Sequence, residues 1–286
     1  MTGEKVQLYL ADMGVKGAGS SHKIGVGEPL GQFYGYISDG LYQVSDFNYD
    51  KASGKYTLKD GIPYRGEKDK VQPGMLKFKN IDGSEDNKIT EDDKTVIGNA
   101  FPKFYGGINN TFTYKDFDLS IFLTYSFGND VLNATKLTNT RTALTNKNVL
   151  AAADWNHRWV TINKETGALI TDPEELAAAN QGKTIACFDD NGSSDNAVIH
   201  SWAVEDGSYL KLSNITLGYT FPKKIVNKIG LSKLRLYATG NNLLTWTKYT
   251  GYDPEVSTMS NAMTPGVDFG AYPRSRSFVF GVNVAF

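Results

Sequence analysis

The chain has 286 residues, enough for one large domain or two small ones. Its net charge of −1 and pI of about 6.3 provide no basic field for nucleic acid, which we exclude as a partner. The single cysteine, Cys187, excludes a disulfide within the chain and a cysteine metal cluster.

The N-terminus lacks the apolar core of a secretory signal. No stretch is long and apolar enough for a membrane helix, and the mean hydropathy is −0.36. These features leave a membrane β-barrel open, because its strands place only alternate residues in lipid. A barrel protein must cross the inner membrane, so we would then expect the chain to be incomplete or mis-started at Met1.

An acidic segment at residues 82–93 is similar to a twelve-residue calcium loop. The residues at the ligand positions of such a loop would be Asp82, Ser84, Asp86, Lys88 through its carbonyl, Thr90 and Asp93. Asn87 replaces the usual glycine of the sharp turn, and Asp93 replaces the longer glutamate that closes such loops. The segment predicts a structural calcium site, with a solvated acidic surface loop as the alternative.

Four internal segments alternate between large apolar and small or polar residues, the period of a strand. They are Phe104–Tyr114, Phe117–Phe127, Tyr209–Phe221 and Lys233–Tyr249. Each is at least as long as the roughly 9–11 residues that a tilted strand needs to cross a bilayer. Aromatic residues gather at their ends, as the interfacial girdles of membrane barrels require.

The last twelve residues continue this pattern to the final side chain. Phe278, Phe280, Val282, Val284 and Phe286 share one face, which we interpret as an outer-membrane assembly signal of the terminal strand. Small or polar residues such as Asn283 fall on the other face. Such a strand is typical of a barrel with an oily face toward lipid and a small face toward the lumen.

Connection lengths alternate between short and long. Residues 115–116 and 222–232 are short connections, whereas residues 128–208 and 250–274 are long and irregular. If the C-terminus is periplasmic, every long connection falls outside the cell, as in outer-membrane barrels. The predicted strands are too few to close a barrel, so we expect part of a larger one.

The long segment 128–208 holds two tryptophans, Trp155 and Trp159. Exposed aromatics there could stack on sugar rings or contact a lid protein, and the alternative is that they pack the core of the loop. Residues 172–179 predict a short helix capped by Asp172. No triad, carboxylate pair or histidine cluster stands out, so we do not expect an enzyme.

A soluble alternative is a secreted, calcium-stabilised β-sandwich that binds glycans. It predicts that the face with Ile215, Leu217, Tyr219 and Phe221 is an internal core. The membrane hypothesis predicts instead that this face is exposed to lipid.

Six ordered blocks of sequence resemble a known family. They are 28–43 (EPLGQFYGYISDGLYQ), 73–79 (PGMLKFK) with 97–102, 117–131, 204–222 (VEDGSYLKLSNITLGYTFP), 241–255 (NNLLTWTKYTGYDPE), and 272–286. The chain resembles the C-terminal part of SusC/RagA-type TonB-dependent transporters of Bacteroidetes.

This resemblance implies that residues 1–286 are the C-terminal portion of a large antiparallel outer-membrane β-barrel with long extracellular loops. It implies an importer of glycans or peptides that is energised by TonB and covered by a SusD-like surface lipoprotein. The signal peptide, TonB box and plug domain of the family have no counterpart in these residues, so we do not expect energised transport by this chain alone.

Overall fold

Strands make up most of the regular structure in the computed structural model. The structure describes residues 8–12, 20–140, 148–186, 198–258 and 262–286. These residues fall into two compact units. The first contains 1–100, 132–204 and 258–270, and the second contains 101–131, 205–257 and 271–286.

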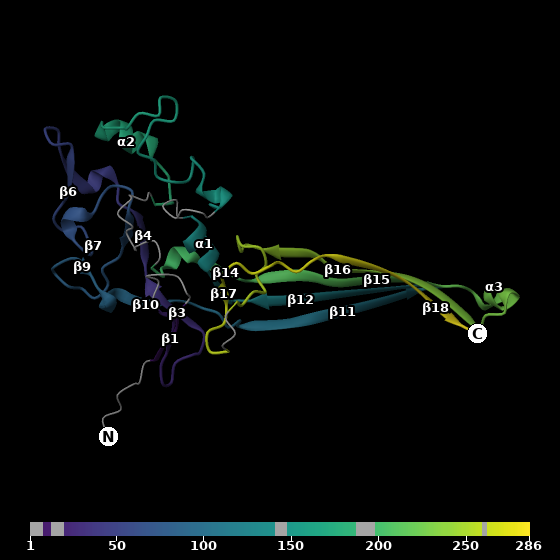
Figure 1. Cartoon of the computed structure of the whole chain (residues 1–286). Coiled ribbons are helices and arrows are strands. Elements are labelled where there is room, and N and C mark those ends of the chain that lie inside the picture. Colours follow the sequence, from purple (N-terminus) through teal and green to yellow (C-terminus); the bar gives the residue numbers. More distant parts are fainter. Residues whose placement is uncertain (1–7, 13–19, 141–147, 187–197, 259–261) are drawn as a thin grey trace, which may run out of the picture. The chain divides into compact units, whose positions relative to one another are not determined.

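One antiparallel five-stranded sheet dominates the second unit (Figure 1). Its strands in spatial order are β11 (Phe104–Tyr114), β12 (Phe117–Phe127), β15 (Tyr209–Thr220), β16 (Lys233–Thr247) and β18 (Ser277–Ala285). The alternating segments of the sequence therefore all form strands, and the predicted bounds differ from the observed ones by at most two residues.

Local backbone features join and shape these strands. β11 and β12 meet in a tight turn where Lys115 adopts a left-handed φ of 53°. A register shift between Leu212 and Asn214 places an extra residue, Ser213, in β15. The bulge keeps Leu212 on the same face as Ile215, because the extra residue offsets the alternation.

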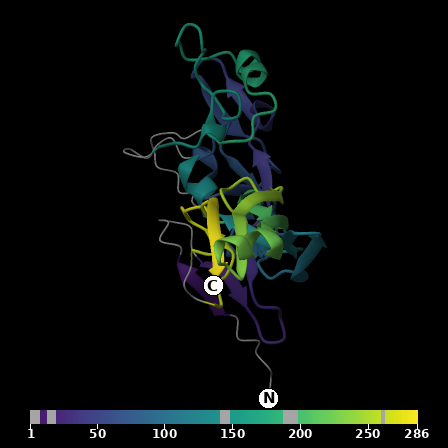
Figure 2. The same cartoon turned by 90° about the vertical axis from the view of Figure 1, so that its right-hand side faces the viewer.

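The short connections and the C-terminus meet at one end of this sheet. β15 and β16 are joined through α3 (Lys223–Val226) and a 3-10 turn, η7 (Asn227–Ile229). The Ser232 amide donates to the Ala285 carbonyl at 2.8 Å, which ties the end of β18 to this connection (Figure 2). This arrangement confirms the predicted alternation, since the long segments 128–208 and 248–276 start and end at the opposite strand ends.

The first unit is built from short strands and turns. A four-stranded sheet has the order β1 (Leu8–Asp12), β2 (Ser20–Ile24), β3 (Gln32–Tyr36), β10 (Lys94–Asn99). Three strand pairs follow: β4 (Ser38–Leu41) with β8 (Leu76–Phe78), β5 (Phe47–Asp50) with β6 (Lys55–Leu58), and β7 (Tyr64–Arg65) with β9 (Lys88–Ile89).

The remaining elements are short as well. They are β13 (Asp130–Asn133), β14 (Val204–Asp206), β17 (Val267–Asp268), α1 (Ala134–Asn139), α2 (Pro173–Ala179), and the 3-10 turns η1 (Val44–Asp46), η2 (Lys68–Lys70), η3 (Glu91–Asp93), η4 (Ala151–Ala153) and η6 (Ser201–Ala203). α2 is the helix predicted from sequence, and the Asp172 carboxylate accepts from the Glu174 and Glu175 amides.

Separate hydrophobic clusters stabilise the first unit. One cluster centres on Phe33, Leu132 and Ile199, and another on Trp159 with Leu41 and Leu176. Burial of these side chains is the main favourable contribution to folding of this unit. No described helix is both long and apolar enough to cross a membrane.

Candidate functional site

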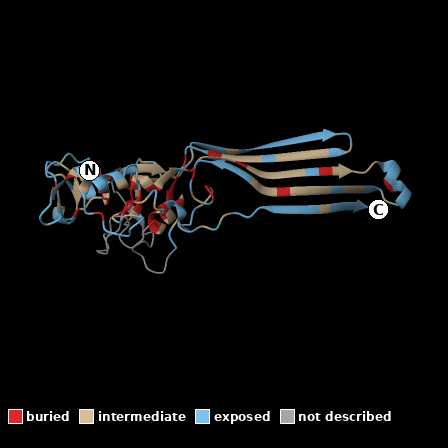
Figure 3. Ribbon diagram, turned by 90° about the horizontal axis from the view of Figure 1, so that it is seen from above, coloured by how far each residue is buried: buried red, intermediate tan, exposed pale blue. Residues whose placement is uncertain are grey.

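The large apolar side chains of the sheet share one face. The register aligns Leu119, Leu217, Ala238 and Phe280 across four neighbouring strands. Most of this face is exposed, and the strands are drawn largely in pale blue and tan in Figure 3. Exposed fractions along the terminal strand are 67% for Phe278, 80% for Phe280, 59% for Val282, 45% for Val284 and 94% for Phe286.

An apolar surface of this extent is unfavourable in water and marks a membrane or protein contact. A sandwich would bury it, but Leu217 is 51% exposed. The face therefore has the composition and exposure of a lipid-facing band.

The opposite face carries a polar network that runs across the strands. The Asn214 amide donates to Asn241 at 2.8 Å, and the Asn241 amide donates to the Ser277 hydroxyl at 3.0 Å. The hydroxyls of Thr216 and Thr239 are 2.8 Å apart. These bonds satisfy polar groups that would otherwise be left unpaired, so this face suits a polar conduit.

A glycine makes room for an ion pair on the same face. Arg235 of β16 reaches across β15 to Asp118 of β12 in a two-pronged pair, with distances of 3.0 Å and 2.5 Å. A Cβ at Gly218, on the strand between them, would lie 2.3 Å from the Arg235 guanidinium and 2.5 Å from the Asp118 carboxylate. Glycine at this position is therefore a requirement of the pair.

A second ionic cluster lies at the other end of β15. Tyr209 and Lys211 donate to the Glu255 carboxylate at 2.7 Å and 2.6 Å, and Arg274 lies 3.1 Å from it. Lys211 is 2% exposed. Burial opposes the charge of Glu255, yet the hydrogen bonds from Lys211 and Tyr209 keep the pKa of its carboxyl below the usual value.

Sequence analysis missed this cluster because its members are up to 65 residues apart in the chain. The available signal was a lysine within an alternating strand, a position where a charge needs a partner. Glu255 thus fixes the segment that follows β16 to the polar face.

The predicted calcium ligands do not converge in the described structure. No group of three or more described His, Cys, Asp or Glu residues is placed to hold a metal ion. Asp93 is fully buried and accepts from the Ile81, Asp82 and Thr90 amides, while Asp82 and Asp86 accept from the Ser84 and Lys88 amides. The three carboxylates among the predicted ligands therefore serve as acceptors for backbone amides in this structure, and calcium stays a prediction from the sequence.

The two tryptophans have different environments. Trp159 is 2% exposed and packs in the cluster with Leu41 and Leu176, so its predicted role as a surface contact is wrong and the core alternative holds. Trp155 is half-buried, with Arg158 and Lys183 over its ring at 5.9 Å and 5.8 Å. A contact role for Trp155 stays a prediction.

Comparison with known proteins identifies the relatives of the chain. TonB-dependent receptor P3 of Formosa agariphila is 33% identical over 265 residues, which is 91% of this chain and 22% of the receptor. TonB-dependent receptor SusC of Bacteroides thetaiotaomicron is 26% identical over 208 residues, 72% of this chain and 17% of the receptor. The chain belongs to the SusC/RagA type of TonB-dependent receptors. No family model matches it.

The solved structures that are similar support the same fold. The RagAB peptide importer in its open-open state superposes with a TM-score of 0.56 and 21% identity, covering 100% of this chain and 25% of that chain. The RagAB peptide transporter superposes with a TM-score of 0.53 and 22% identity, and the match covers 89% of this chain and 23% of that chain. The chain spans about a quarter or less of these SusC/RagA-type proteins, which are receptors and transporters and not enzymes.

Proposed function

We propose that the chain forms part of the wall and the external loops of an outer-membrane importer. The observation that carries this function is the two-faced sheet. Its exposed apolar face suits lipid, and its hydrogen-bonded polar face suits a lumen through which an oligosaccharide or peptide passes. Outer-membrane location of the relatives supports the same placement.

The importer would work with a SusD-like surface lipoprotein and draw energy from TonB through parts of the protein outside these residues. Support comes from the names of the relatives, a SusC receptor and a RagAB peptide importer. We propose that the cargo is an oligosaccharide or a peptide. The importer would carry this cargo through the membrane without cleaving any bond in it.

Surface labelling of intact cells tests this function on the whole gene product that carries the chain. An epitope inserted after Gly167, in a turn with open space around it, should be labelled by antibody on intact cells. The matched control is an epitope after Gly230, in the short connection between β15 and β16, which should be labelled only after the cells are opened. Labelling of both sites on intact cells, or recovery of the protein outside the outer-membrane fraction, would contradict the proposal.

The β-sandwich alternative lacks support from any specific contact. It requires a partner layer over Leu217 and Phe280, which are 51% and 80% exposed in the described structure. We therefore retain the importer as the single proposed function.

A further inference from the structure

A pocket with charged side chains in its lining lies in the first compact unit, at β4 and β8. Its volume is about 520 Å³, within the range of about 300–1,000 Å³ typical of small-molecule sites. Asp39, Asp46, Lys77, Lys183 and Trp202 contribute to its lining. None of these residues belongs to the sheet faces described above.

Contacts between distant segments hold the pocket walls in place. The Ser38 amide donates to the Ser201 hydroxyl at 3.0 Å, and the Tyr36 amide donates to the Ile199 carbonyl at 3.0 Å. Leu41 of β4 pairs with Leu76 of β8. These contacts hold β4, β8 and the segment around Ser201 together, and an ordered wall lowers the entropic cost of binding a ligand.

Negative charge is in excess at one part of the lining. The Lys77 ammonium lies 3.5 Å from Asp46 and 3.8 Å from Asp39, so two carboxylates share one cation. The side chains of Lys77 and Asp46 are each only 16% exposed. A ligand with an ammonium group would complete the neutralisation.

Positive charge is in excess at another part. Lys183 donates to the Trp155 carbonyl at 2.9 Å, and no carboxylate of the described residues lies within ion-pair distance of it. Burial and the neighbouring charge of Arg158 lower the pKa of Lys183, and the more weakly coupled charge of Asp154 offsets this only in part. A ligand carboxylate would favour the charged form of Lys183 by supplying an opposite charge next to it.

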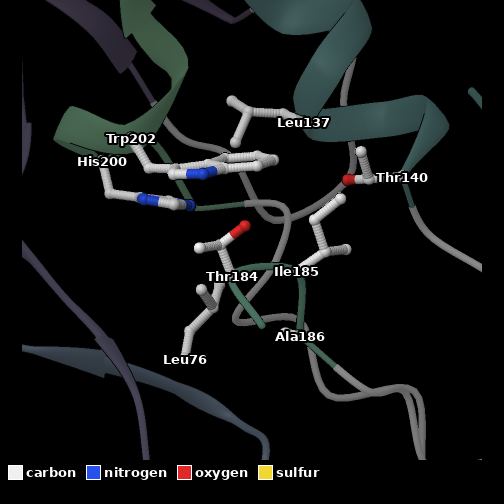
Figure 4. Close-up of a pocket in the computed structure, with 8 residues that line it drawn as sticks. All are labelled: Leu76, Leu137, Thr140, Thr184, Ile185, Ala186, His200 and Trp202. Atoms are coloured by element: carbon white, nitrogen blue, oxygen red, sulfur yellow. The ribbon is translucent and has the colours of Figure 1, made fainter. Parts of the chain in front are cut away.

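The aromatic wall does not favour a sugar. The ring of Trp202 stacks on His200 with centroids 5.9 Å apart, and the Lys136 ammonium lies 4.1 Å from its centroid. Figure 4 shows the two rings lying parallel at the edge of a small cavity. The volume of this cavity is about 10 Å³, and it shares Leu76, Thr184 and Trp202 with the larger pocket. His200 and Lys136 already contact this ring, which leaves less of it for stacking on a sugar.

The small cavity adds a polar group that has no partner. His200 is 1% exposed and its Nδ1 has no hydrogen bond within the described structure. A buried nitrogen of this kind calls for a hydrogen-bonding group, and the cavity is about the size that holds one water. This nitrogen adds one hydrogen-bonding group beside the larger pocket.

We propose that this pocket binds a zwitterionic peptide, with the carboxylate at Lys183 and the ammonium group at Asp39 and Asp46. This inference gives the importer a cargo class, and in that respect it rests on the proposed function. The opposite charges on one lining, and the engaged Trp202 ring, are what separate a peptide from a neutral oligosaccharide.

Calorimetric titration of the purified full chain in detergent micelles tests the site. The probes are triglycine, N-acetyl-triglycine, triglycine amide and maltotriose. Because each charged contact contributes a charge-assisted hydrogen bond, triglycine should bind about tenfold more tightly than either blocked peptide. Maltotriose should bind more weakly than triglycine, and equal affinity for all four probes would overturn the proposal.

Two variants assign the ends of the ligand. Lys183→Gln should weaken triglycine about tenfold and leave triglycine amide unchanged. Asp39→Asn should weaken triglycine and leave N-acetyl-triglycine unchanged. Lys164→Gln and Asp69→Asn, at exposed charges that do not line the pocket, are the matched controls.

The control variants should bind all probes as the unmodified chain does, and circular dichroism should give the same spectrum for all four variants. Equal losses for free and blocked peptides in Lys183→Gln would overturn the assignment. Triglycine binding in a protein that fails the surface-labelling test would sustain the pocket and contradict the importer. Surface labelling without triglycine binding would contradict the pocket alone.

Discussion

Two tryptophans that are four residues apart show how much burial changes the role of a side chain. Trp159 fills a core beside Gly74, where a Cβ would lie 2.5 Å from its ring. We expect Trp159→Ala to lower the free energy of unfolding by about 3–5 kcal/mol through the cavity that it leaves. Trp155→Ala should cost about 1 kcal/mol, because it removes only half-exposed ring contacts with cations.

Urea unfolding of both variants in detergent micelles measures the difference between their free energies of unfolding. Trp159→Phe serves as the conservative control, since it retains most of the packing and removes an indole N–H that has no partner. Equal losses for Trp155→Ala and Trp159→Ala would contradict the assignment of Trp159 to the core.

Asp93 is a second residue whose role depends on its partners. Its carboxylate accepts from three backbone amides, and each amide left unpaired costs about 1–3 kcal/mol. We expect Asp93→Ala to destabilise the protein by at least about 2 kcal/mol, whereas the exposed neighbour Asp92→Ala should have little effect.

Thermal unfolding in EDTA and in calcium separates the backbone role of Asp93 from the predicted metal role. If Asp93→Ala lowers the stability by the same amount in EDTA and in calcium, the only role of Asp93 is to accept hydrogen bonds from the backbone amides. Stabilisation of the unmodified chain by calcium, absent in Asp93→Ala, would support the site predicted from the sequence.

At the scale of the strand, the two faces of β18 should respond differently to charge. Val282 lies on the apolar face and Val279 on the polar face, with exposed fractions of 59% and 46%. Val282→Lys should destabilise the folded protein in membranes by about 2–4 kcal/mol, because it places an ammonium group in lipid. Val279→Lys, the same substitution three residues away, should be tolerated beside Thr239.

The fraction of each variant that resists heat denaturation after outer-membrane extraction measures this difference. Equal tolerance of the two lysines would contradict the lipid-facing assignment of Val282, Phe280 and Phe278.

The strands could be predicted from sequence because alternation with a period of two is a local property. The ends of Phe117–Phe127 and Phe104–Tyr114 match the structure to the residue. The contacts that join Glu255 to Lys211 and Ser38 to Ser201 are long-range, and no local pattern encodes them. Core packing was one of the two roles that the sequence left open for Trp159, but its distant partner Leu41 was not predicted.

Two units of different construction make up the whole molecule. The first has buried clusters of its own, whereas the sheet of the second leaves large apolar side chains exposed. Among the described residues, the extended apolar surface that needs an apolar solvent lies on the second unit. Trp246, 52% exposed at the end of β16, and Trp155, half-buried in the first unit, can report on each.

Quenching by a brominated detergent compares the two units directly. We expect strong quenching in a variant that retains only Trp246 and weak quenching in one that retains only Trp155, with phenylalanine at the other tryptophans. Micelles should cover the apolar face that carries Leu210, Leu244 and Trp246, and so bring the brominated chains next to the Trp246 ring. Weak quenching of Trp246, in a chain that stays monomeric without detergent, would contradict the membrane assignment and favour a soluble sheet.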